Sequence, residues 1–146
     1  MLTMKNFDFW VKWLIGANVM TLIVGLIVAF AGNSFFFAYH NAQTEIVFFD
    51  ENELAQNELY LKNWLFGIIG GTIVGFHILM IFITNNAYRK REKWAYWAMW
   101  LGLLSWFVID SSISTFYGAV YNVYLINIVA LVLSGLPLIM TRKAFN

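Results

Sequence analysis

The chain has 146 residues, of which 61% are hydrophobic, 19% are aromatic and only 12% are charged. A soluble domain carries about twice this share of charge, and a globule of this size could not bury so much apolar surface. The net charge of +1 offers no basic surface to a nucleic acid, and the lack of cysteine excludes disulfide scaffolds and thiolate metal sites. An integral membrane protein remains.

Four stretches are long and apolar enough to cross a bilayer, which takes about 20 residues. They cover approximately residues 10–31, 63–84, 94–114 and 122–141 of a single membrane domain, 1–146. The first is longer than the apolar core of a signal peptide, so we expect a retained span. We therefore predict an all-α integral membrane protein in which four transmembrane helices form an up-down bundle.

The distribution of charge predicts the orientation of these spans. Lysine and arginine gather before the first span, in the loop 85–93 and after the last span, whereas the loop 32–62 is mainly acidic. Positive residues tend to stay on the cytoplasmic side of a membrane. Both termini and the loop 85–93 are therefore predicted to be cytoplasmic, and the loop 32–62 extracytoplasmic.

The loop 32–62 contains the pattern of a helix start. Asp50 and Glu53 have the spacing of a capping box, in which a cap residue and an acid three positions later satisfy backbone amides. The pattern predicts a short amphipathic helix that begins at Asp50 and leads into the second span.

Two features of the spans concern helix packing. Gly67, Gly71 and Gly75 lie on one stripe of the second span, where another backbone could approach closely. The stripe could serve packing within the bundle, a homo-oligomer contact or a pore-lining groove. Pro137 interrupts the fourth span and frees the carbonyl of Leu133, for which the hydroxyl of Ser134 is a candidate partner.

Two ionisable residues lie inside predicted spans, where each costs a few kcal/mol and requires a reason. His77 lies roughly 10 Å from the inner end of its span, and Asp110 lies roughly 24 Å from the inner end of its own. Because their depths differ by roughly 13 Å, we expect them not to touch.

Other polar residues are predicted to lie near Asp110 in the outer half of the third and fourth spans. If this region is wet, Asp110 can bind a cation or an amine; if it is dry, a structural pair with Asn127 or a serine is the alternative. We predict an outward-facing ligand site formed by Asp110, Ser111, Ser114, Tyr117 and Asn127.

A second set of polar residues predicts an inner layer with one polar group on each helix. Within it, His77 is expected to be a core histidine hydrogen-bonded to Asn18 or Ser134. The layer consists of Asn18, His77, Ser105 and Ser134.

The same inventory excludes several kinds of cofactor. His40 and His77 lie at different depths, so one chain cannot supply both axial ligands of a haem. No metal-binding motif is present, and no lysine lies deep in a span to form a retinal Schiff base. We therefore predict no cofactor and no metal.

The order of aromatic and polar residues around the third span is similar to that of small bacterial proteins with four spans. This resemblance implies a location in the bacterial cytoplasmic (inner) membrane. It is carried by Arg91-Glu92-Lys93-Trp94-Ala95-Tyr96-Trp97, Trp106, Asp110, Ser114, Tyr117-Gly118 and Asn122.

Three functional hypotheses follow. The first is the binding or transport of a small molecule or ion at Asp110. The second is a non-catalytic subunit or assembly factor of a larger membrane complex, whose partners would be the bilayer and other chains or copies of itself. The third is an intramembrane enzyme for a lipid-like substrate, with Asp110 or His77 as acid or base.

Overall fold

A computed structural model describes residues 4–49 and 54–145, and within these ranges the chain is helical without strands. Four helices are long and apolar enough to cross a membrane, which confirms the predicted class. They are α1 (Met4–Ala31), α3 (Gln56–Ile83), α4 (Lys93–Phe116) and the segment that ends in α6 (Ile128–Thr141).

Short helical segments connect or extend these four. Among them, η2 and η3 are π-helical turns that continue α3 and precede α6, and η4 is a 3-10 turn that follows α6. The bounds are η1 (Phe35–Phe37), α2 (Ala38–Phe49), η2 (Thr84–Tyr88), α5 (Val120–Asn122), η3 (Val123–Asn127) and η4 (Arg142–Ala144).

The segment before α3 differs in detail from the sequence-based prediction. Asp50 and Glu53, the expected capping pair, lie outside the described residues. The helix α2 ends before them, at Phe49, and α3 starts after them, at Gln56. At that start the Glu58 carboxylate accepts a hydrogen bond of 2.8 Å from the backbone N–H of Ala55, which satisfies one of the free amides of the first turn.

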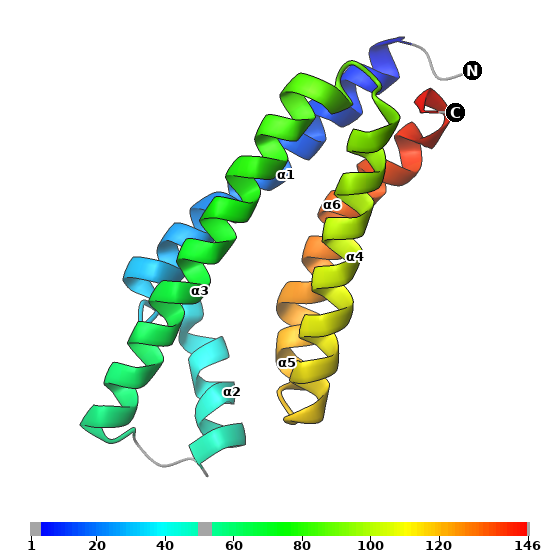
Figure 1. Cartoon of the computed structure of the whole chain (residues 1–146). Coiled ribbons are helices and arrows are strands. Elements are labelled where there is room, and N and C mark those ends of the chain that lie inside the picture. Colours follow the sequence, from blue (N-terminus) through cyan, green and yellow to red (C-terminus); the bar gives the residue numbers. More distant parts are fainter. Residues whose placement is uncertain (1–3, 50–53, 146) are drawn as a thin grey trace.

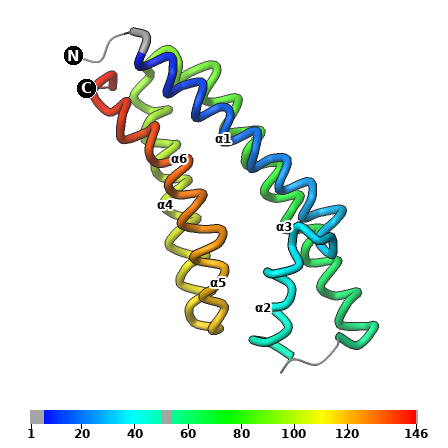
Figure 2. The backbone as a smooth tube through the Cα atoms, turned by 180° about the vertical axis from the view of Figure 1, so that it is seen from behind, coloured from blue at the N-terminus to red at the C-terminus, as the bar shows by residue number. Residues whose placement is uncertain are grey.

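The helices form two pairs that diverge from a common end (Figures 1 and 2). The helix α1 packs along α3, and α4 packs against α6 and η3, while α1 also contacts α6. Both termini lie at the end where the pairs meet, and α2 lies at the opposite end, where they are apart.

The main hydrophobic core lies at this common end. Aromatic and aliphatic side chains from α1, η2, α4, α6 and the C-terminus are buried together there, because this is where all four long helices approach one another. Arg91, with a left-handed φ of 62°, turns the chain between η2 and α4. Its guanidinium lies 4.8 Å from the centre of the Phe7 ring. The most buried members are Val11, Leu14, Tyr88, Ala95, Met99 and Leu138.

A side chain of α1 satisfies the carbonyl that Pro137 frees in α6. The indole N–H of Trp13 donates to the carbonyl oxygen of Leu133 at 3.0 Å. This oxygen would accept from residue 137 in an unbroken helix, but proline has no N–H. Ser134, the partner suggested by the sequence, is not the donor in this structure. The bond therefore joins the two helix pairs at the proline.

Candidate functional site

Asp110, on α4, accepts three hydrogen bonds on a single carboxylate oxygen. The side-chain amides of Asn122 and Asn127 donate to Oδ1 at 2.9 and 2.7 Å, and the hydroxyl of Ser114 donates at 3.2 Å. Asn122 also donates to Ser114 Oγ at 3.0 Å. Because the two amides come from α5 and η3, this network ties α4 to the segment that leads into α6. A carboxylate suits the position, since it only accepts hydrogen bonds.

Asn127 completes the network from a fully buried position. Its amide nitrogen also donates to Ser111 Oγ at 3.0 Å. Its amide oxygen is buried and receives no hydrogen bond from the described residues, and none of them donates to Asp110 Oδ2. A buried acceptor without a donor is costly, so the site has hydrogen-bonding capacity that these residues leave unused.

A π-helical turn places the two asparagines on one face. In an α-helix, residues five apart point about 140° away from each other. Asn122 and Asn127 are five apart, but η3 lies between them, and a π-turn closes its hydrogen bonds at this same spacing. Both amides can therefore reach the same oxygen of Asp110. In a regular α-helix Asn122 and Asn127 would lie on different faces, and the predicted site did not include Asn122.

Four of the five predicted site residues are joined in this network, and one is not. Asp110, Ser111, Ser114 and Asn127 are linked by hydrogen bonds. Tyr117 is 60% exposed and packs edge to face against Phe116 with ring centres 5.1 Å apart. Tyr117 is the C-terminal cap of α4. The helix therefore ends before its spacing can bring Tyr117 onto the face that carries Asp110.

The helix α2 contacts both helix pairs and reaches the Asp110 network. The ring of His40 lies 5.1 Å from the Tyr121 ring and 6.2 Å from the Phe66 ring of α3. One turn later, the hydroxyls of Thr44 and Tyr121 are 2.7 Å apart. Through Tyr121, the loop helix thus contacts the segment that also carries Asn122 of the Asp110 network, a contact that sequence analysis did not find.

His40 lies outside the spanning helices, and its surroundings disfavour the charged form. Burial lowers the pKa of His40 from its ordinary value of 6.5, the hydrogen bond with Asn122 opposes this effect, and the positive charge of Lys62 adds to it. Its Nδ1 atom is buried without a hydrogen-bond partner among the described residues. The ring is therefore an uncharged contact between α2 and the rest of the chain at neutral pH.

The predicted inner layer is present only in part. His77 Nδ1 and Asn18 Oδ1 are 2.7 Å apart, and the buried Asn18 amide donates to the Leu14 carbonyl at 2.7 Å. Since the side-chain oxygen of Asn18 can only accept a hydrogen bond, His77 Nδ1 is the donor. Ser134 is buried and Ser105 is exposed, and neither is hydrogen-bonded to this pair in the described chain.

The close contact between α1 and α3 is made by a glycine other than those of the predicted stripe. A Cβ atom on Gly70 would lie 2.5 Å from the carbonyl oxygen of Gly25, so only glycine fits there. At Gly71 and Gly75 an added Cβ would meet no atom within 4 Å, and at Gly67 it would meet one only at 4.0 Å. Gly71 and Gly75 therefore lie on a face of α3 that does not contact α1, whereas Gly67 lies at the edge of the α1 contact.

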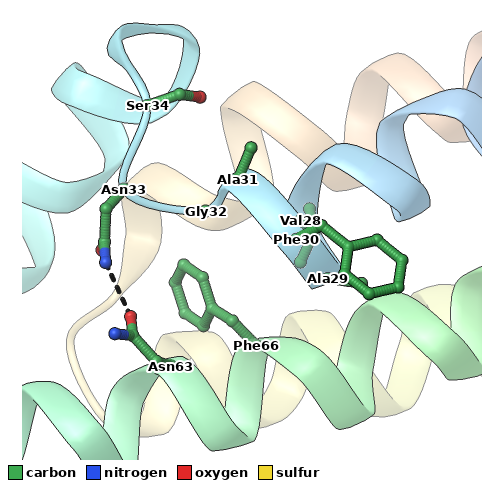
Figure 3. A pocket seen from close by; sticks show the side chains of 9 residues that line it. All are labelled: Val28, Ala29, Phe30, Ala31, Gly32, Asn33, Ser34, Asn63 and Phe66. Atoms are coloured by element: carbon green, nitrogen blue, oxygen red, sulfur yellow. Dashed lines mark hydrogen bonds between the residues drawn. The ribbon is translucent and has the colours of Figure 1, made fainter.

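A separate pocket of about 240 Å³ lies where α1 ends beside α3 (Figure 3). Asn33 donates to the side-chain oxygen of Asn63 at 2.7 Å across its mouth. The ring of Phe66 lies so close to Gly32 that a Cβ there would come within 2.5 Å of it. The hydroxyl of Ser34 is buried without a partner among the described residues. This pocket does not include Asp110.

The described residues contain no group of three or more histidine, cysteine, aspartate or glutamate side chains that could hold a metal ion. The Asp110 network offers side-chain oxygens of Asp110 and Asn127 as hydrogen-bond acceptors. No protein family, no curated protein and no solved structure matches the chain.

Proposed function

We propose that this protein is a small membrane protein that binds or transports a cation or protonated amine at Asp110, from the extracytoplasmic side. The observation that carries the proposal is the pair of unused acceptors, Asp110 Oδ2 and the buried Asn127 Oδ1. An ammonium group or a metal cation supplies what both atoms lack. The described chain provides no ion pair for Asp110, which leaves this position free to bind a positively charged ligand.

The proposal includes an up-down arrangement with both termini in the cytoplasm of a bacterial cell. Two observations support it. Figure 1 shows both termini at one end of the molecule, and the basic loop between α3 and α4 lies at that same end. In this orientation α2 and Asp110 are nearer the extracytoplasmic face, where a ligand in solution reaches them first.

Native mass spectrometry of the chain, gently extracted from its own membrane, tests the binding proposal. We expect a discrete non-lipid mass on the wild-type chain and its loss in Asp110→Asn, which keeps the size of the side chain but removes its charge. Titration with sodium and methylammonium ions then gives the relative affinity for the two simplest cations. Binding should weaken at least about tenfold in the variant, as expected for a lost charge-assisted contact.

Ser112→Asn is the matched control, because Ser112 is exposed on the same helix and lies outside the network. It should leave both the bound mass and the cation affinity unchanged. Unchanged cation binding in a folded Asp110→Asn variant would remove the proposal, and the network would then be a structural tie between α4 and η3.

The second candidate is a subunit or assembly factor of a larger membrane complex, and the exposed glycines of α3 favour it. Only 11% of the most apolar window of residues 56–88 is buried within the chain. Gly71 and Gly75 are exposed one turn apart, so another helix could approach the backbone of α3. Gly71→Leu/Gly75→Leu should then release a co-purifying chain, whereas Ile78→Leu, on the same helix, should retain it. An active, monomeric wild-type chain would count against this candidate.

A further inference from the structure

A second pocket lies at the end of the molecule where the helix pairs meet. Its volume is about 310 Å³, and it is formed where the start of α4 faces η4 and the C-terminus. The residues that line it are Lys93, Tyr96, Trp97, Arg142 and Phe145. None of them belongs to the Asp110 network, so this pocket is independent of the function proposed above.

The polar groups of this pocket can donate hydrogen bonds, and two are positively charged. Lys93 and Arg142 are exposed, and neither forms an ion pair with a carboxylate of the described residues. The carboxylate next to Lys93 in the sequence, that of Glu92, accepts a hydrogen bond from the Trp94 indole and does not line the pocket. The pocket is therefore lined by two positively charged side chains and by no acidic side chain, which favours an anionic ligand.

Aromatic rings form the inner wall of the pocket and hold its shape. The rings of Tyr96 and Phe145 are stacked with centres 4.8 Å apart, and both residues are at least 93% buried. The Tyr96 hydroxyl has no hydrogen-bond partner among the described residues and is not enclosed, so it is available to a ligand. Trp97 is 67% exposed beside it. An exposed tryptophan at a span end is typical of the bilayer interface.

We infer that this pocket binds the phosphate headgroup of an anionic phospholipid. Lys93 and Arg142 neutralise the phosphate, Tyr96 donates a hydrogen bond to it, and the indole of Trp97 packs beside the glycerol region. Free phosphate compounds have the same anionic chemistry. The lipid is favoured because the pocket lies where two apolar spans end, and because its walls are aromatic.

Retention of lipid by the purified full-length chain in detergent tests this inference. Phosphatidylglycerol and phosphatidylcholine are titrated separately, and bound lipid is counted by native mass spectrometry. We expect a clear preference for phosphatidylglycerol, which falls at least about tenfold in Lys93→Gln/Arg142→Gln, because that variant loses two direct charge-assisted contacts with the phosphate. Arg89→Gln/Lys143→Gln removes the same charge at the same end outside the pocket, and should change the preference by less than about threefold.

Three further results separate the outcomes. Lys93→Arg/Arg142→Lys keeps both charges and should retain the lipid, which guards against loss of binding through misfolding. An equal loss in the two Gln double variants would overturn the inference, because a diffuse surface charge would explain it. Displacement of phosphatidylglycerol by inorganic phosphate would also overturn it and assign the pocket to a soluble phosphate compound.

Discussion

At the scale of single residues, the described chain contains buried hydrogen-bonding groups that have no partner. The carboxylate of Asp110 is held by donors on one oxygen, while the amide oxygen of Asn127 is buried and unmatched. His40 shows a related imbalance, because its ring packs against Tyr121 and Phe66 while Nδ1 is buried without a partner in the described chain. Such atoms are sensitive to substitution and, for His40, to protonation.

The pH dependence of stability should therefore report on His40. Burial lowers its pKa below 6.5 in the folded chain, so the unfolded chain takes up a proton first as the pH falls. The contribution of the neutral ring to stability is fully present well above pH 6.5 and is lost as the pH falls toward the folded pKa. We expect the free energy of unfolding in detergent to decrease on acidification from about pH 8 to about pH 5.

His40→Gln supplies the comparison, because it keeps a polar side chain but cannot titrate. Its unfolding free energy, measured by tryptophan fluorescence in denaturant, should vary less with pH over this range than that of the wild type. An identical pH dependence in both chains would show that the loss of stability comes from other groups.

At the scale of secondary-structure elements, the contacts between helices depend on a few close approaches. The indole of Trp13 satisfies the carbonyl of Leu133 next to Pro137, and Gly70 allows the backbones of α1 and α3 to meet. Neither contact depends on hydrophobic burial, which does little for association within lipid, where the surroundings are equally apolar. Steric fit and hydrogen bonding decide these contacts.

Trp13→Phe should lower the free energy of unfolding by about 1 kcal/mol, because it leaves the Leu133 carbonyl without its donor. In a Pro137→Ala background residue 137 has an N–H that can bond to this carbonyl, so the same substitution should cost much less. Denaturant unfolding of the four chains in this double-mutant cycle measures the coupling. Equal costs in both backgrounds would contradict this account, and Trp10→Phe is the control for the loss of an indole.

Gly70→Ala should destabilise the chain by about 2 kcal/mol, because its Cβ has to displace the backbone of α1. The adjacent Gly71→Ala should not destabilise the chain and should raise its stability by up to about 1 kcal/mol, since its Cβ meets open space and alanine favours a helix. Thermal unfolding of both variants in one detergent gives the comparison. A larger effect at Gly71 than at Gly70 would mean that α3 packs through the stripe instead.

At the scale of the whole molecule, the chain is two helix pairs joined at one end and connected by α2 at the other (Figure 2). The buried core, the chain termini and the basic pocket lie at the joined end. The Asp110 network and α2 lie toward the open end. If this molecule crosses a membrane as proposed, the two ends face different compartments and carry different functions.

The absence of cysteine allows a direct test of this orientation. Ala42→Cys, on α2, should react with a membrane-impermeant maleimide added to intact cells, whereas Lys90→Cys should react only after the membrane is permeabilised. Both positions are exposed, so access to the reagent and not burial decides the result. The reverse pattern would invert the orientation, and labelling of both sites in intact cells would indicate two orientations.

The sequence by itself determined the class of the protein and its four apolar helices. These properties are local, since length and hydropathy within one segment decide whether it can span a bilayer. The grouping of Asp110 with Ser111, Ser114 and Asn127 was also predictable, because depth along straight helices follows from the rise per residue. The use of this group as a ligand site stays a prediction.

Only the tertiary structure decided which faces of the helices meet. The close contact of Gly70 with α1, the bond from Trp13 to Leu133 and the contact of α2 with Tyr121 depend on how each helix is rotated about its axis. The inclusion of Asn122 depends on the π-turn η3, which changes that rotation by a full residue. In helices that are apolar on every side, the sequence contains no amphipathic pattern to define the rotation, so close packing and hydrogen bonds between helices define it.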